Sequence, residues 1–344
     1  MHAYAIQPSA GLVKLDAMEN PYPLSPELQR ELGERLGGVA INRYPAQSVA
    51  DAAAALAEFV DLPAGCKLML GNGSDELINL LAMACDVPGG SVLAPLPGFV
   101  MYAMSAQLQG LQFLGVPLTP DFELDAPAML AAIEQYRPSI TYIAYPNNPT
   151  ANLFDDAVID KIVAAVGAQG RGFVVFDEAY QPFSSRSWMQ RMAAQPHVLV
   201  LRTLSKFGLA GVRLGYLCGA AALIEQIDKV RPPYNISVLN AEATLFAIDH
   251  ADEFARQAAL LRESRAWLQG ALADIAGVRV YPSEANMILL RVPDSKRAFE
   301  GMKARGVLVK NVAGMHPLLA NCLRLTVGTA DENQLMLQAL KASL

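Results

Sequence analysis

The stretch GFVVFDEAY, residues 172–180, places a carboxylate directly after a run of apolar residues. Such a run is typical of a strand that is buried on both faces, as in a parallel sheet covered by helices. Asp177 then lies at the carboxyl end of the strand, the edge at which ligands bind in open α/β sheets. A carboxylate in a dry site needs a cation or several hydrogen-bond donors. The alternative is an aspartate that only caps the next turn.

Runs of the same kind lie on both sides of this stretch, and segments of helical spacing separate them. Helical spacing is clearest at residues 51–60, 75–84 and 156–168. The alternation predicts an α/β fold, in which a mostly parallel seven-stranded sheet lies between helices. The other apolar runs are KLML (67–70), SVLA (91–94), LQFLGV (111–116), ITYIAY (140–145), VLVLR (198–202) and LGYLC (214–218).

The remainder of the chain predicts a second, smaller α/β unit. Residues 241–275 have the pattern of one long helix, after which VRVY, NMILLRV, GVLVK and CLRLTV alternate with helices at 296–304 and 331–340. The proline-rich opening segment is expected to form an arm rather than a domain. We therefore expect an N-terminal arm over residues 1–40, a large domain over 41–250 and a small C-terminal domain over 251–344.

Composition disfavours several functional classes. The net charge is −6 and no run of lysine or arginine occurs, so electrostatic binding of nucleic acid has little support. The sequence has no basic leader and no apolar run of about 18 residues, so we expect a cytoplasmic protein that does not enter the membrane.

Cysteine and histidine usage predicts neither disulfides nor a metal site. The cysteines are far apart and form no CxxC pair, so buried thiols are expected, and the histidines have no metal-ligand spacing. The cysteines are Cys66, Cys85, Cys218 and Cys322, and the histidines are His2, His197, His250 and His316.

Polar groups follow two other predicted strands at the same edge of the sheet. YPNNPT ends one strand with an Asn-Pro turn, which is also an ordinary loop signal, and Asn148 would project beside Asp177. TLSK follows another strand and adds the amine of Lys206, which could also be a solvated strand terminus. Because the carboxyl ends of parallel strands meet at one edge, we expect an amide, a carboxylate and an amine to converge.

An anion site is predicted beside these three groups. GNGSDELI (71–78) leads from a strand into a helix, so the backbone N–H groups of Ser74 and Asp75 can hold an anion. Taken alone, this segment could equally be a helix cap that binds nothing. Thr203, Ser205 and Arg213, on either side of the lysine, supply further donors.

One cofactor accounts for the whole set. Pyridoxal 5'-phosphate requires an amine for its aldehyde, a carboxylate for its ring nitrogen, donors for its phenolic oxygen and a cradle for its phosphate. Lys206 and Asp177 fill the first two roles, Asn148 with Tyr180 fills the third, and the anion site fills the fourth. We expect Arg213 and the cationic ring to lower the pKa of the lysine.

The chain resembles the fold-type I, aspartate-aminotransferase-like enzymes in NNPT, DEAY and the SK lysine followed by an arginine. Within them it is similar to the histidinol-phosphate aminotransferases, through LDAMENPY, NRYP, GNGSDELI, TLSKFGLAGVRLGY and CLRLTVGTADEN, which span nearly the whole chain. The resemblance implies a homodimer with the active site at the subunit interface and the arm packed on the small domain and the partner. It also implies that Lys206, Asp177 and Tyr180 are catalytic.

Further site residues are implied by the resemblance alone. Phe99 falls where these enzymes stack an aromatic ring on the pyridine, and Tyr44 matches a residue that reaches the cofactor phosphate of the other subunit. Arg324 matches the anion-binding arginine for the substrate. Candidates for the phosphate end of the substrate are Asn20, Tyr22 and Lys310.

The resemblance implies amino transfer between L-histidinol phosphate and 2-oxoglutarate, which gives imidazole-acetol phosphate and L-glutamate in L-histidine biosynthesis. The alternatives are an aromatic or broad-specificity aminotransferase, a threonine-phosphate decarboxylase, and a pyridoxal-phosphate-binding regulatory module without turnover. A nucleotide-binding Rossmann protein is disfavoured, because no GxGxxG follows the first strand.

Overall fold

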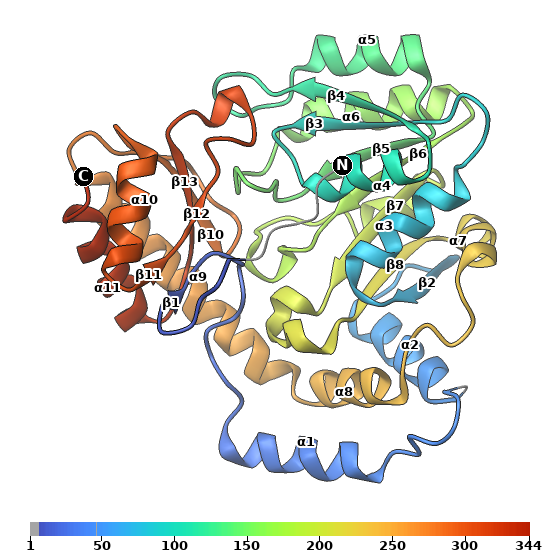
Figure 1. Cartoon of the computed structure of the whole chain (residues 1–344). Coiled ribbons are helices and arrows are strands. Elements are labelled where there is room, and N and C mark those ends of the chain that lie inside the picture. Colours follow the sequence, from blue (N-terminus) through green and yellow to red (C-terminus); the bar gives the residue numbers. More distant parts are fainter. Residues whose placement is uncertain (1–6, 46) are drawn as a thin grey trace.

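The computed structural model describes residues 7–45 and 47–344, so His2 lies outside the described residues. Two α/β bodies lie side by side, and helix α9 (Ala251–Ala273) runs from the larger body to the smaller one (Figure 1). The segment that precedes the larger body contributes to both of them.

The larger body is built on a seven-stranded sheet, which confirms the predicted fold. The strand order is β2-β8-β7-β6-β5-β3-β4. Strand β8 runs antiparallel to both of its neighbours, and the other neighbouring strands pair in parallel. The strands are β2 (Cys66–Gly71), β3 (Ser91–Leu96), β4 (Gln112–Pro117), β5 (Ile140–Ala144), β6 (Phe173–Asp177), β7 (Val198–Thr203) and β8 (Gly215–Ala220).

Helices cover both faces of this sheet, which explains why β6 is apolar throughout. Val174 and Phe176 point into one core with residues of α5 and α6, whereas Val175 points into the other core with residues of α3 and α4. The helices of the larger body are α2 (Gln47–Phe59), α3 (Gly73–Ala84), α4 (Val100–Leu108), α5 (Ala126–Tyr136), α6 (Asp156–Ala168), α7 (Ala221–Ile227) and α8 (Val238–Asp249).

The smaller body is an antiparallel sheet of order β12-β13-β10-β9. Its core is continuous with the N-terminal segment, because β1 (Val13–Lys14) pairs in parallel with β11 (Val307–Leu308). The other elements are β9 (Arg279–Val280), β10 (Met287–Arg291), α10 (Ser295–Ala304), β12 (Lys310–Asn311), β13 (Cys322–Thr326) and α11 (Ala330–Lys341).

The segment expected to be an arm contains a helix that packs on the larger body. Helix α1 (Pro26–Gly38) begins after the cap Ser25 and lies along α8 (Figure 1). Arg35 donates hydrogen bonds to Glu242 at 2.6 Å and to Asp249 at 2.7 Å. The domain boundaries at residues 40 and 250 stay a prediction.

The single helix predicted over residues 241–275 was wrong. Two helices, α8 and α9, meet at His250, whose backbone leaves the helical region at φ −110° and ψ 27°. Asp252 and Glu253 in the first turn of α9 favour a new helix start, a signal that apolar spacing conceals. The run GVLVK likewise divides into β11 and β12, which belong to different sheets.

Three further observations concern the described part of the chain. Its helices include none that is both long and apolar enough to cross a membrane. No group of three or more metal-binding side chains is found among the described residues. The four cysteines are free thiols, of which Cys85, Cys218 and Cys322 are buried and Cys66 is partly exposed.

Candidate active site

A cavity lies at the carboxyl ends of β5, β6 and β7. Its lining includes every predicted cofactor-binding residue except Tyr44, together with Met18 from the N-terminal segment and Tyr102 from α4. The predicted residues that line it are Ser74, Asp75, Phe99, Asn148, Asp177, Tyr180, Thr203, Ser205, Lys206 and Arg213.

Lys206 lies in the short helical turn that follows β7, and its amine points to the N-terminal segment. Nζ donates a hydrogen bond to the carbonyl oxygen of Ala17 at 2.9 Å. Burial lowers the pKa of Lys206 to about 8, and the positive charges of Arg324 and Arg213 add to this effect. The expected lowering is therefore present, but burial rather than Arg213 is its largest cause. A larger share of the amine is uncharged near neutral pH, as a nucleophile or base requires.

Asp177 is a buried carboxylate with neutral hydrogen-bond partners. Tyr102 Oη donates to Oδ2 at 2.6 Å, and the N–H of Ala179 donates to Oδ1 at 3.1 Å. Burial raises the pKa of Asp177 to about 6 against the effect of these two bonds, and the charges of Asp75 and Glu178 raise it further. A cation beside the carboxylate would stabilise its ionised form, and the protonated ring nitrogen of pyridoxal phosphate is such a cation.

The anion cradle depends on two glycines that bring backbone segments together. A Cβ at Gly215 would lie 2.7 Å from the carbonyl carbon of Gly73 and from the backbone nitrogen of Ser74. A Cβ at Gly73, where φ is 77°, would lie 2.7 Å from Nη2 of Arg213. Larger residues at these positions would push the start of α3 away from the arginine.

Donors from two elements converge on this cradle. Arg213 Nη1 donates to Ser205 Oγ at 3.3 Å, and Thr203 Oγ1 donates to the same hydroxyl at 3.0 Å. Arg213 also lies 3.5 Å from Asp75 at the start of α3. Hydroxyls, a guanidinium group and a helix N-terminus are the donors that a phosphate dianion requires. The cavity therefore fits pyridoxal phosphate through the amine of Lys206, the carboxylate of Asp177 and the phosphate cradle.

Arg324 connects the smaller body to this site. It lies on β13, is 6% exposed, and donates to Asn148 Oδ1 and to the carbonyl oxygen of Asp16, both at 2.8 Å. Asn148 in turn donates through Nδ2 to the hydroxyl of Tyr180 at 3.1 Å. The arm, the large body and the small body thus meet at one set of hydrogen bonds.

Five predicted residues do not line the cavity: Arg324, which reaches it only through Asn148, and Tyr44, Asn20, Tyr22 and Lys310. Tyr44 is 78% exposed and stacks on Tyr234, with ring centroids 4.6 Å apart. Asn20 donates to Gln257 at 2.8 Å and accepts a hydrogen bond from the N–H of Tyr22. Lys310, on β12, lies opposite Arg324 in the strand register. Phe99 does line the cavity, and its ring meets that of Tyr102 edge-on at 5.6 Å.

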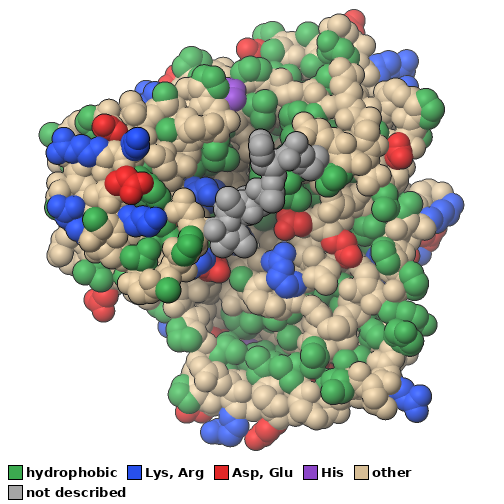
Figure 2. Space-filling view, in the orientation of Figure 1, with side chains coloured by type: hydrophobic (Ala, Val, Ile, Leu, Met, Phe, Trp, Pro, Cys, Tyr) green, Lys and Arg blue, Asp and Glu red, His purple; other side chains and the backbone are tan. Residues whose placement is uncertain are grey.

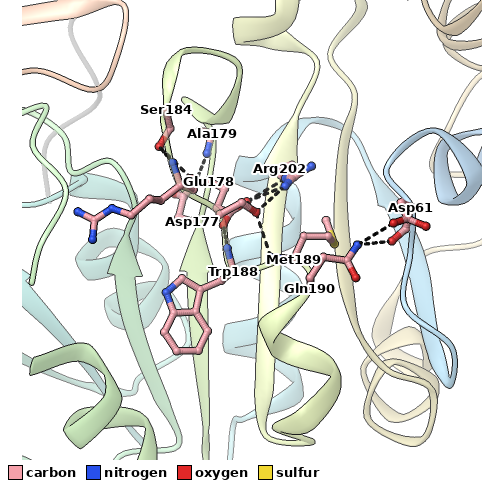
Figure 3. A network of polar contacts seen from close by, with 11 residues as sticks. Asp61, Asp177, Glu178, Ala179, Ser184, Trp188, Met189, Gln190 and Arg202 are labelled. Carbon is pink, nitrogen blue, oxygen red and sulfur yellow. Dashed lines mark hydrogen bonds and ion pairs between the residues drawn. The ribbon is translucent and has the colours of Figure 1, made fainter. Parts of the chain in front are cut away.

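A buried ion pair between Glu178 and Arg202 connects the carboxyl ends of β6 and β7 (Figure 3). Glu178 accepts hydrogen bonds from Arg202 Nε at 3.0 Å, from Ser187 Oγ at 2.9 Å and from the N–H of Trp188. Because Glu178 follows β6 and Arg202 lies in β7, the pair joins the strand that carries Asp177 to the strand that leads to the lysine.

Tyr102 at the site and the contact of Lys206 with Ala17 were not predicted from the sequence, and only Tyr102 has a recognisable sequence pattern. Tyr102 follows Phe99 by three residues at the start of a helix, so both lie on one helix face, and that spacing is visible in PGFVMY. The contact between the amine of Lys206 and Ala17 joins residues 189 positions apart and left no local signal.

Comparison with known proteins assigns the family. The sequence matches the family model for aminotransferase class I and II over residues 10–340. It is 70% identical to a protein from Methylibium petroleiphilum named histidinol-phosphate aminotransferase, over 100% of this chain and 92% of the relative.

Solved structures share the fold. The histidinol-phosphate aminotransferase from Clostridium acetobutylicum has a TM-score of 0.87 at 18% identity, covering 96% of this chain and 98% of that one. The enzyme of the same name from Sinorhizobium meliloti, solved in complex with pyridoxal-5'-phosphate, has a TM-score of 0.81 at 23% identity, covering 98% and 94%. At these low sequence identities the solved structures support the fold alone. The family assignment rests on the match to the family model and on the relative that is 70% identical. The chain belongs to the class I and II aminotransferases, which depend on pyridoxal phosphate.

Proposed function

We propose that this chain is a histidinol-phosphate aminotransferase. It transfers an amino group between L-histidinol phosphate and 2-oxoglutarate, giving imidazole-acetol phosphate and L-glutamate in L-histidine biosynthesis. The observation that carries the proposal is the shared cavity of Lys206, Asp177 and the phosphate cradle, in a chain 70% identical to a relative with this name. When bound, pyridoxal phosphate supplies the electron-accepting ring that amino transfer needs.

The residues of the cavity have distinct roles in this proposal. Nζ of Lys206 would take up and release the proton at Cα of the substrate, and its lowered pKa favours this proton transfer. The carboxylate of Asp177 would hold the protonated ring nitrogen of the cofactor. Asn148 and Tyr180 would hold its phenolic oxygen, and Phe99 would contact its ring.

One anion site serves both substrates. Histidinol phosphate carries a phosphate but no α-carboxylate, whereas glutamate carries carboxylates only. The planar guanidinium of Arg324 suits either anion, and its hydrogen bond to Asn148, which lines the cavity, supports this role. We assign Asn20 and Tyr22 of the arm, and Lys310, which pairs with Arg324 in the strand register, to the phosphate end of the substrate.

We further propose a cytoplasmic homodimer in which Tyr44 of one protomer reaches the cofactor phosphate of the other. Tyr44 is 78% exposed, and Ile41 at 75% and Tyr234 at 55% lie with it on the surface. Hydrophobic side chains gather around α1, α2 and α8 on this face of the molecule (Figure 2). So many exposed apolar side chains are typical of an interface.

Complementation tests the shared site. Lys206→Ala and Tyr44→Ala variants, each inactive as a homodimer, should regain activity when they are mixed and reassembled. One of the two sites in the mixed dimer then has both an intact lysine and an intact tyrosine. Activity that stays absent, although the mixed dimer forms, would contradict the proposal.

Substrate comparison tests the activity. The purified enzyme with pyridoxal phosphate is given L-histidinol phosphate, phenylalanine or threonine phosphate, and the absorbance of the bound cofactor and the release of CO2 are followed. Amino transfer from histidinol phosphate should have by far the highest kcat/KM. Phenylalanine used equally well would favour a broad-specificity aminotransferase, CO2 from threonine phosphate would favour a decarboxylase, and no turnover would favour a binding module.

A further inference from the structure

Two buried tyrosines stack beside Asp177. Tyr102 on α4 and Tyr142 on β5 are 2% and 1% exposed, and their rings are nearly parallel with centroids 4.2 Å apart. Their hydroxyl groups differ in one respect. That of Tyr102 donates to Asp177 Oδ2 at 2.6 Å, whereas that of Tyr142 is buried without a hydrogen-bond partner among the described residues.

The hydrogen bond from Tyr102 restrains one of the two oxygens of the carboxylate. Oδ1 accepts the N–H of Ala179 from its own loop, so Oδ2 is tied to α4 and Oδ1 to the end of β6. Two donors from different elements fix both the position and the plane of a carboxylate. Loss of the tyrosine hydroxyl would leave the carboxylate free to turn about the Ala179 bond.

The hydrogen bond from Tyr102 counteracts the negative charges around Asp177. Negative charges on Asp75 and Glu178 oppose its ionisation, and the tyrosine hydroxyl favours it. The titratable groups that surround it are Asp75 from α3, Tyr102 from α4, Tyr142 from β5, Glu178 and Tyr180 from the loop after β6, and Lys206 and Arg213 from the loop after β7.

We propose that the hydroxyl of Tyr102 is a positioning group, which holds the Asp177 carboxylate ionised and aligned for the ring nitrogen of pyridoxal phosphate. The inference rests on the proposed role of Asp177 and deepens it. The tyrosine acts through the carboxylate, and both its ring and the ring of Phe99, which it meets edge-on, line the cavity.

Tyr102→Phe is the test, and Tyr142→Phe is its matched control. Both changes remove one hydroxyl from the same ring stack, but only the first removes a hydrogen bond. Affinity for pyridoxal phosphate is measured on the cofactor-free, full-length protein by fluorescence titration between about pH 5.5 and 8.5. Urea unfolding of the same preparations reports on folding.

The expected result is a selective loss in Tyr102→Phe. Affinity for pyridoxal phosphate should fall roughly ten- to a hundredfold, the effect of losing a hydrogen bond to a charged group. The loss should be greater at lower pH, because the carboxylate, whose pKa already lies at about 6, then takes up a proton more readily. Tyr142→Phe should bind like the wild type.

A cofactor analogue with carbon in place of the ring nitrogen separates positioning from packing. The analogue should bind wild type and Tyr102→Phe equally well, because it has no ring proton for the carboxylate to meet. The inference is overturned if Tyr102→Phe binds pyridoxal phosphate as tightly as Tyr142→Phe, or if it loses affinity for the analogue to the same extent. If the wild-type enzyme transaminates histidinol phosphate, either of these results refutes only the positioning role of Tyr102. If the wild-type enzyme is inactive, the proposed function itself is refuted.

Discussion

Replacing the active-site lysine is expected to stabilise the cofactor-free protein while abolishing amino transfer. Burial, with Arg324 and Arg213, lowers the pKa of Lys206 from 10.5 to about 8. The folded protein therefore holds a charged amine at neutral pH at a cost in stability. Lys206→Met removes the charge and retains most of the side-chain length, so that cost disappears together with the base.

The magnitude follows from the lowered pKa. Each unit by which a pKa is lowered corresponds to about 1.4 kcal/mol, so the lowering of the Lys206 pKa from 10.5 to about 8 gives a cost on the order of 3 kcal/mol for the charge. Part of the Lys206 side chain still faces the cavity, so water screens some of this cost. The lost hydrogen bond to Ala17 removes about 1 kcal/mol more from the gain. We expect a net stabilisation of about 1 to 2 kcal/mol at pH 7.

The pH dependence has a definite sign. The unfolded chain keeps the lysine proton up to about pH 10.5, whereas the folded protein releases it near pH 8. Below about pH 8 the amine of Lys206 is charged in both states, and the full cost is present. As the pH rises from about 8 towards 10.5, the folded protein releases its proton first and the wild type gains stability. The advantage of the variant should therefore shrink between about pH 7 and about pH 9.5.

Urea unfolding of the cofactor-free proteins at these two pH values measures the difference. Lys161→Met, on an exposed position of α6, controls for the removal of a lysine charge as such. A Lys206→Met variant that is less stable than the wild type at pH 7, or a stability difference that does not change with pH, would refute the reasoning.

Three further predictions concern the supports of the site. Glu178→Gln leaves the guanidinium of Arg202 buried without its charge partner, so the free energy of unfolding should fall by about 3 kcal/mol in urea titrations, and a loss below about 1 kcal/mol would contradict a structural ion pair. Arg324→Ala should raise KM for both histidinol phosphate and glutamate at least about tenfold, and a rise for glutamate alone would disprove the shared anion site. Gly215→Ala should weaken cofactor binding in a fluorescence titration, because its Cβ would meet the backbone at the start of α3. Gly211→Ala, whose Cβ would have no atom within 4 Å, should bind the cofactor normally, and equal binding by both variants would contradict the cradle.

Much of the fold was predictable because its signals are local. Each core strand of the large sheet is an apolar run bounded by polar residues, and each run with its helix is encoded within a short stretch. The break at His250 was not predicted, because α8 and α9 have apolar residues on both sides of the junction and only the acidic first turn of α9 marks a new start.

The site was predictable where the topology alone brings residues together. Asn148, Asp177 and Lys206 follow neighbouring parallel strands, so any such sheet collects them at one edge. The role of Arg324 came only from family resemblance, since it lies on a strand of the other body. Its contact with Asn148 spans 176 positions and depends on how the two bodies pack.

By itself the sequence determined an α/β protein whose amine, amide and carboxylate meet at the carboxyl ends of a mostly parallel sheet. Alternating strands and helices and strand-end positions are properties of short segments, so no tertiary information is needed to read them. Tertiary structure alone decided how those groups behave. It placed the amine of Lys206 on the Ala17 carbonyl and the hydroxyl of Tyr102 on Asp177, and burial moved the pKa values of Lys206 and Asp177 towards neutrality. Desolvation and long-range contacts arise from packing, and packing is not written in any one stretch of the chain.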